Sequence, residues 1–167
     1  ESRGLGDVYK RQTVDDLDNA LHAMQDKIDT LKKSASSKQA RIKEVDELLR
    51  MVDYYKSGKP AADKLKFIRF EKSRQKYKAE HNNELRTFYM AERKLKPYFK
   101  DGKLPITAWR REQEQLEQEY RDIQTELSPL HADVKKLWAI HYNIYEVQHE
   151  QKRQNAATRQ KKQEIEH

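Results

Sequence analysis

The chain has 167 residues, of which 38% are charged and 35% are hydrophobic, and its net charge is +7. So polar a chain cannot fill a thick globular core, whereas long helices that bury one narrow stripe need much less apolar surface. The absence of cysteine excludes disulfides and thiolate chemistry, and no apolar run reaches the ~20 residues of a membrane-spanning helix. We therefore expect one all-α domain, cytoplasmic and without a membrane partner.

The positive charge is concentrated in one part of the chain. Residues 61–100 carry 12 basic and 5 acidic side chains, whereas residues 101–148 carry 6 basic and 9 acidic ones. A localised basic face indicates an anionic partner more strongly than a diffuse excess of charge does.

The first twelve residues, ESRGLGDVYKRQ, resemble the conceptual translation of a transposase adapter used to prepare sequencing libraries. We therefore expect residues 1–12 to be a non-native artefact and the natural sequence to begin near Thr13, with more of the protein encoded upstream.

From Thr13 onward, apolar side chains recur at alternating spacings of three and four, which is the pattern of a coiled-coil seam. The pattern predicts a helix over about 13–56, whose stripe needs a partner helix. The seam positions are Val14, Leu17, Leu21, Met24, Ile28, Leu31, Ala35, Ile42, Val45, Leu49 and Val52, with only Lys38 breaking the register.

The predicted helix ends at Lys56-Ser57-Gly58-Lys59-Pro60, the one place where Gly and Pro fall together between two long apolar-periodic runs. Glycine accepts the positive φ that ends many helices, and proline suits the start of the next one. These residues are therefore expected to form the tip of an antiparallel helical hairpin.

The second arm is predicted over about 61–97, with a break near 81–83 where Asn82 or Asn83 can cap a new helix. Pro97 and Asp101-Gly102 are expected to end this arm. Its apolar face is less regular than the first and consists of Leu65, Phe67, Ile68, Phe70 and Tyr77.

A third helix is predicted over about 106–148, again with strict three-four spacing, and it either packs back along the hairpin or dimerises through its own seam. Its seam positions are Trp109, Gln113, Leu116, Tyr120, Ile123, Leu127, Leu130, Val134, Leu137, His141, Ile144 and Gln148. Pro129 indicates either a kink or two helices in line. Residues 13–148 thus form the helical coiled-coil domain, and 149–167 form a charged tail that is a fraying helix or disordered.

No catalytic arrangement is evident. The pairs His131–His141 and His141–His149 lack the i, i+4 spacing that brings two imidazoles to one helical face, and four glycines cannot build a phosphate-binding loop. The carboxylates are expected to be solvated or to pair with Lys and Arg, and the tyrosines lack an activating neighbour. We therefore expect no enzymatic activity, metal, cofactor or small-molecule substrate in this chain.

The basic segment is the one candidate site. Arg69, Lys72 and Lys76 have helical i, i+3, i+7 spacing, which predicts a ridge that can follow a phosphate backbone without reading bases. The alternative is a solvated face that balances the acidic third helix across the bundle. The candidate DNA-contacting residues are Lys66, Arg69, Lys72, Arg74, Lys76 and Lys78.

Three stretches, LLRMVDYYKSGKP, DKLKFIRFEKSRQKYKAEHNNELRTFYMAERKLK and LPITAWRREQEQLEQEY, carry a family resemblance. Together they make the region from about Ile28 to Tyr120 similar to the part that follows the catalytic domain in relaxases, the mobilisation nucleases of bacterial conjugative and mobilisable elements. Relaxases nick one DNA strand through a tyrosine nucleophile and a metal held by a histidine cluster. Both belong to the N-terminal domain of the family, and nothing in this chain resembles that cluster.

The resemblance implies a non-catalytic C-terminal helical part of a plasmid or transposon mobilisation relaxase, with the catalytic domain absent from these residues. Its expected partners are DNA, transfer-machinery proteins, or other copies of the chain. The alternative from a different class is a structural coiled-coil scaffold or oligomerisation module without a nucleic-acid role.

Overall fold

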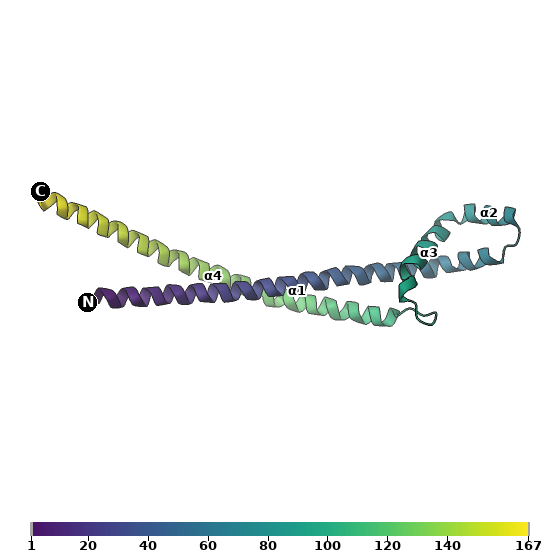
Figure 1. Cartoon of the computed structure of the whole chain (residues 1–167), viewed down its shortest axis with the longest axis horizontal. Coiled ribbons are helices and arrows are strands. Elements are labelled where there is room, and N and C mark those ends of the chain that lie inside the picture. The colour runs from purple at the N-terminus through teal and green to yellow at the C-terminus, as the bar shows by residue number, and fades with distance from the viewer. Residues whose placement is uncertain (1, 167) are drawn as a thin grey trace. The chain divides into compact units, whose positions relative to one another are not determined.

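The computed structural model describes the backbone of residues 2–166 and the side chains of residues 13–166. In this part of the chain there are four α-helices and one 3-10 turn but no β-strand, so the all-α prediction is confirmed (Figure 1). The elements are α1 (Ser2–Phe67), α2 (Glu71–Glu80), α3 (Asn82–Leu95), η1 (Lys96–Tyr98) and α4 (Ile106–Glu166). The side chains of the suspected adapter segment, residues 1–12, lie outside the described ones.

The chain divides into two compact units. One unit, called the central unit below, comprises Ser36–Arg121, and the other, the terminal unit, comprises the chain up to Ala35 and from Asp122 onward. Each unit contains one segment of α1 and one segment of α4.

In both units the α1 and α4 segments pack against each other. They are antiparallel, because residues farther along α1 pair with residues earlier in α4: Asp18 with His141 and Lys27 with Glu126 in the terminal unit, and Lys38 with Glu119 and Arg41 with Glu112 in the central unit. Every predicted seam position from Val14 to Val52 and from Trp109 to Gln148 is buried or half-buried. The three-four spacing therefore identified both stripes, and the third predicted helix packs back along the first.

The predicted hairpin tip at Lys56–Pro60 is wrong, because α1 continues through it as far as Phe67. Pro60 lies inside the helix, where it cannot donate a hydrogen bond to the carbonyl group of Lys56. Gly58 is buried against α3: a Cβ atom there would lie 2.5 Å from Cβ of Phe88 and 2.9 Å from the carbonyl oxygen of Glu84. The glycine thus allows α1 and α3 to approach each other closely, and it does not end a helix.

The second predicted arm is in fact divided between the end of α1 and two shorter helices. The break near 81–83 is confirmed, since α2 ends at Glu80 and α3 begins at Asn82. However, the residue at the N-cap of α3 is His81, and no side chain caps this helix, so capping by Asn82 or Asn83 is wrong. The backbone of His81 (φ −112°, ψ 25°) makes the bend by itself.

After η1 the chain reverses at the predicted Asp101-Gly102 turn. Both residues have positive φ, 53° and 73°, as a two-residue hairpin turn requires. Lys100 and Lys103 close the turn with reciprocal backbone hydrogen bonds of 2.9 and 3.0 Å.

Helix α4 continues through Pro129 to Glu166, so the alternative of two helices in line is wrong. Ser128 and Pro129 are exposed, so the backbone hydrogen bond that proline cannot donate is missing on the solvent-exposed side of the helix. The charged tail is also helical, so its disordered alternative is wrong, and every side chain from His149 to Glu166 is exposed.

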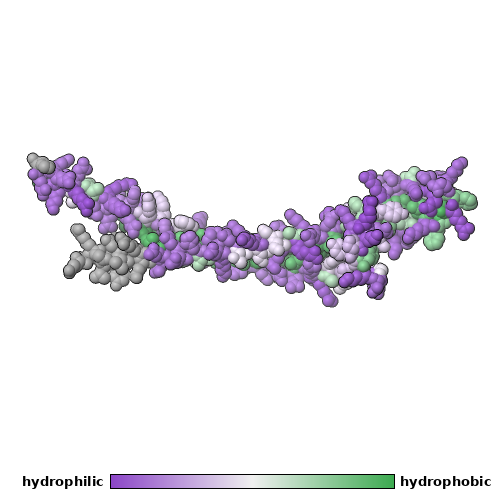
Figure 2. All heavy atoms as spheres, in the orientation of Figure 1, coloured by the Kyte–Doolittle hydropathy of each residue, from purple (hydrophilic) through white to green (hydrophobic). Residues whose placement is uncertain are grey.

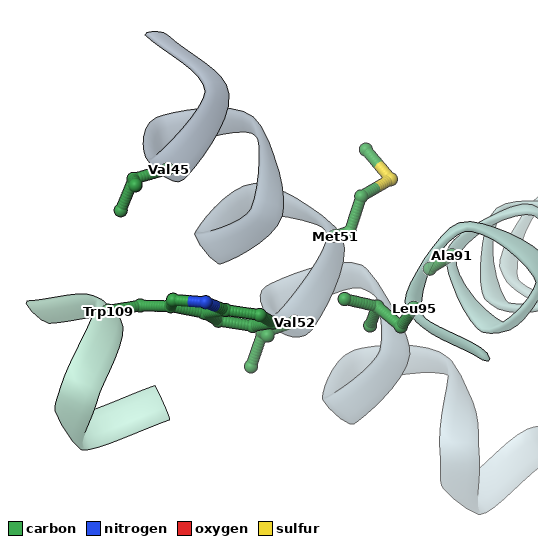
Figure 3. Packing of buried hydrophobic residues seen from close by; sticks show 6 residues of the cluster. All are labelled: Val45, Met51, Val52, Ala91, Leu95 and Trp109. Carbon is green, nitrogen blue, oxygen red and sulfur yellow. The ribbon is translucent and has the colours of Figure 1, made fainter. Parts of the chain in front are cut away.

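Two hydrophobic clusters hold the central unit together. The tryptophan cluster joins α1, α3 and α4, and in Figure 3 the indole of Trp109 reaches from α4 toward Val52 of α1. Its buried members are Val45, Met51, Val52, Ala91, Leu95 and Trp109. The phenylalanine cluster joins the end of α1 to α3 through Ala61, Ala62, Leu65, Leu85 and Phe88.

Candidate nucleic-acid interface

All six candidate DNA-contacting residues lie where α1 passes into α2. We call residues 66–78 the basic turn: it contains the end of α1, the connection 68–70 and most of α2. Lys72 and Lys76 lie one helical turn apart on α2, but Arg69 lies in the connection. The predicted three-residue helical ridge is therefore wrong for Arg69, whose position is set by the connection.

The cations of the basic turn are available to a ligand. Five of them are exposed, and none takes part in an ion pair within 4.0 Å among residues 13–166: Lys66, Arg69, Lys72, Lys76 and Lys78. Closely spaced cations without carboxylate partners repel one another, and a bound polyanion would relieve that repulsion.

Arg74 has a different role from the other candidates. It is half-buried, and its Nη1 donates hydrogen bonds to the carbonyl oxygens of Leu65 at 2.7 Å and Ile68 at 3.1 Å. Carbonyl groups at the end of a helix lack intrahelical donors, and a cation is stabilising there. Arg74 therefore caps α1 and fixes the basic turn. The hydroxyl of Tyr77 adds a second link between α2 and α1, since it donates to the carbonyl oxygen of Ala61 at 3.0 Å.

Three acidic side chains of α4, Glu112, Glu119 and Glu126, form ion pairs with α1. Arg41 donates to both carboxylate oxygens of Glu112, at 2.6 and 3.2 Å, and Lys38 donates to Glu119 at 2.8 Å. In the terminal unit, Nζ of Lys27 lies 3.5 Å from Glu126. Among the described residues, no ion pair links α4 to the basic turn, so the contacts do not support the alternative in which this turn balances α4.

These ion pairs shift the pKa values of the groups that form them. The hydrogen bonds that Arg41 donates to Glu112 and then to Glu44 raise the pKa of Arg41, and the hydrogen bond from Arg41 lowers the pKa of Glu112. The hydrogen bond from Lys38, followed by that from Gln115, lowers the pKa of Glu119. Lys38, which breaks the apolar register of α1, thus binds α4 through its ion pair with Glu119.

Stability is expected to fall in acid because of the two carboxylates. A lowered pKa in the folded state stabilises the fold above the unfolded value of about 4.3, and the contribution is lost as the pH falls through the folded value. Urea unfolding at a series of pH values should therefore show a loss of unfolding free energy below about pH 4.3 that is smaller in Glu112→Gln/Glu119→Gln. The matched control is Glu114→Gln/Glu146→Gln, two exposed α4 residues outside the described ion pairs. If the control variant showed the same small pH dependence of unfolding free energy as the test variant, the assignment to Glu112 and Glu119 would be contradicted.

The basic turn also carries two aromatic side chains that sequence reasoning misplaced. Phe67 is 84% exposed and Phe70 is 78% exposed, so their assignment to a buried apolar face is wrong. Figure 2 shows hydrophobic surface at the end of the central unit where α1 passes into α2, beside hydrophilic atoms. The misplacement followed from the predicted hairpin tip at Gly58, which put both rings inside the second arm. The chain instead turns at 68–70, so both rings lie at the turn. Their direct flanking by Lys66, Arg69 and Glu71 was the available signal.

The histidines do not form a metal site in the described part of the chain, where no three His, Asp or Glu side chains converge in a way that could hold a metal ion. His141 is half-buried at its seam position, with Nε2 3.1 Å from Asp18 on α1. This contact agrees with a polar residue that sets the register of the two helices. None of the described helices is both long enough and apolar enough to cross a membrane.

Comparisons of this chain with the models of known protein families, with curated proteins and with solved structures find no match.

Proposed function

We propose that this chain is a non-catalytic helical module that binds nucleic acid through the phosphate backbone. The observation that carries the proposal is the basic turn, where five exposed cations lie outside the ion pairs of the described residues, while Glu112, Glu119 and Glu126 of α4 pair with α1. The resemblance to the helical region of mobilisation relaxases makes DNA the expected ligand, and a DNA-nicking domain is then the expected neighbour of this module.

The physical basis is the release of counterions. Each lysine or arginine that neutralises a phosphate displaces a condensed cation, so affinity depends steeply on salt but hardly on base sequence. Lys72 and Lys76 lie one turn apart on α2, which lets both contact one strand, and Arg69 adds a fork that can bind a phosphate with two hydrogen bonds. The half-buried Arg74 holds this arrangement in place.

Reversal of three charges is expected to abolish most of the binding. In Arg69→Glu/Lys72→Glu/Lys76→Glu, three phosphate contacts become repulsive, so the affinity of the full chain for DNA should fall by at least about 100-fold at low salt. The slope of log K against log salt concentration should become shallower by about 3. Fluorescence anisotropy with labelled single-stranded and duplex DNA across a salt series measures both quantities.

The matched control is Lys32→Glu/Lys33→Glu/Lys43→Glu, which changes the net charge equally at exposed lysines of α1. It should bind more tightly than the first triple variant and keep most of the salt slope. Equal losses in the two variants would mean that only net charge matters. Failure of the unaltered chain to bind at low salt would refute the proposal.

A second candidate function is a structural scaffold that joins copies of the chain or transfer-machinery proteins. The observation that favours it is an exposed aromatic row on α4, where Trp138, Tyr142 and Tyr145 are 55%, 62% and 53% exposed. Analytical ultracentrifugation should then give one defined oligomer, which dissociates in Trp138→Ala/Tyr142→Ala, and no DNA binding. A monomer that binds DNA would exclude this second function.

A further inference from the structure

The connection between α1 and α2 holds two phenylalanine rings in water. Phe67 is the last residue of α1 and Phe70 directly precedes α2. Neither ring is in contact with another aromatic ring among residues 13–166. Covering exposed phenylalanine side chains removes apolar surface from water, so a ligand that buries both rings is favoured.

Cationic residues flank both rings in the sequence, although Glu71 directly follows Phe70. Lys66 precedes Phe67, Arg69 precedes Phe70, and Lys72 follows in the first turn of α2. All three are exposed and lie outside the ion pairs of the described residues. A ligand with flat apolar groups spaced along an anionic chain would match both features at once.

Hydrogen bonds from both helices hold the backbone of the connection. The backbone N–H of Ile68 donates to the carbonyl oxygen of Leu65 at 3.3 Å, and the backbone N–H of Arg74 donates to the carbonyl oxygen of Phe70 at 2.9 Å. The guanidinium of Arg74 also binds the carbonyl oxygens of Leu65 and Ile68. A fixed connection reduces the entropy that binding would otherwise cost.

We propose that the basic turn binds single-stranded nucleic acid, with bases stacked on Phe67 and Phe70 and the adjoining phosphates bound by Lys66, Arg69 and Lys72. Bases within a duplex are already stacked on one another, so a duplex can use only the phosphate contacts. This inference rests on the proposed function and adds to it a preference for unpaired strands.

A lipid surface is the other ligand class that combines apolar and anionic groups. Binding to a membrane surface scales with a continuous apolar helix face. Here one ring ends α1 and the other is the last residue of the three-residue connection, and the side chains that α2 exposes next to them are polar: Glu71, Lys72, Ser73, Gln75 and Lys76. Stacking requires only isolated rings, so the arrangement fits unpaired bases better.

The test removes the rings without changing any charge. In the full chain, Phe67→Ala/Phe70→Ala should weaken binding to a labelled oligothymidylate by at least about 10-fold, while binding to a duplex of equal length changes by less than about 2-fold. The salt slope should stay unchanged. The matched control, Tyr142→Ala/Tyr145→Ala, removes two exposed rings of the terminal unit and should bind both ligands as the unaltered chain does. Both rings of the basic turn are in water, so the variant is expected to fold.

Further measurements separate this inference from the proposed function. If the unaltered chain binds neither DNA, the proposed function fails and the inference fails with it. If it binds both, and the Phe67→Ala/Phe70→Ala variant binds oligothymidylate equally well, only the inference is overturned. Co-sedimentation with phosphatidylserine vesicles that is lost in this variant, with single-strand affinity unchanged, would overturn it in favour of a lipid surface.

Fluorescence provides a direct sign of stacking. In Phe70→Trp, the new indole should be quenched when oligothymidylate is added, beyond any change in the unaltered chain. An equal response of the two proteins would overturn the stacking at this position.

Discussion

Gly58→Ala is expected to destabilise the protein, although the same change inside an ordinary helix stabilises it by about 1 kcal/mol. The new Cβ would lie 2.5 Å from Cβ of Phe88 and 2.9 Å from the carbonyl oxygen of Glu84, so α1 and α3 must separate. Overpacking of this kind typically costs about 1–3 kcal/mol. Because neither contacted atom can rotate away, the cost should be about 2–3 kcal/mol, and urea unfolding followed by far-ultraviolet circular dichroism should show a net loss of about 1–2 kcal/mol.

The control for this prediction is Ser57→Ala, one residue earlier on the exposed side of α1. Here the higher helix propensity of alanine acts alone, and unfolding free energy should rise by up to about 0.5 kcal/mol. The two adjacent substitutions are thus expected to have opposite signs. A stabilising effect of both would mean that α3 does not cross α1 at Gly58.

Trp109→Ala is expected to have the largest effect of any single substitution proposed above. Trp109 is 5% exposed and belongs to the tryptophan cluster, which packs α4 against α1 and α3. Its indole also meets the ring of Tyr98 edge-on, with the ring centroids 5.4 Å apart. Truncation of a buried tryptophan to alanine costs about 3–5 kcal/mol, because burial is lost and a cavity remains.

Trp138→Ala is the matched control, since Trp138 is 55% exposed on α4. Its removal should cost less than about 1 kcal/mol in urea unfolding. Intrinsic fluorescence provides a second measurement, because emission from the buried Trp109 should shift to longer wavelength on unfolding more than emission from Trp138. Equal losses of stability in the two variants would contradict the assignment of Trp109 to the core.

The seams of α1 and α4 could be predicted from the sequence because a periodic stripe is a local signal. The residues of the stripe repeat every three or four positions whatever the partner, and even Lys38 and His141 proved to be half-buried seam members with carboxylate partners. The helix break at His81 and the reversal at Asp101-Gly102 were also local, since a few residues with special backbone conformations suffice.

The true end of α1 could not be predicted in the same way. Gly58 and Pro60 are the residues that usually stop helices, yet a long-range contact with Phe88 makes glycine necessary inside this one. The actual turn at 68–70 contains no glycine and no proline, and it is stabilised by Arg74 from the next helix. The candidate site was affected accordingly, because moving the turn exposed Phe67 and Phe70 and gave Arg74 a structural role.

The reversal at Asp101-Gly102 has a practical consequence for experiments. Lys103 is exposed beside it, and a Cβ atom at Gly102 would meet no atom within 4 Å. Because the chain contains no cysteine, a thiol introduced in place of Lys103 would be unique. A dye or spin label attached there could report tumbling and ligand-induced motion of the central unit without a competing reactive group.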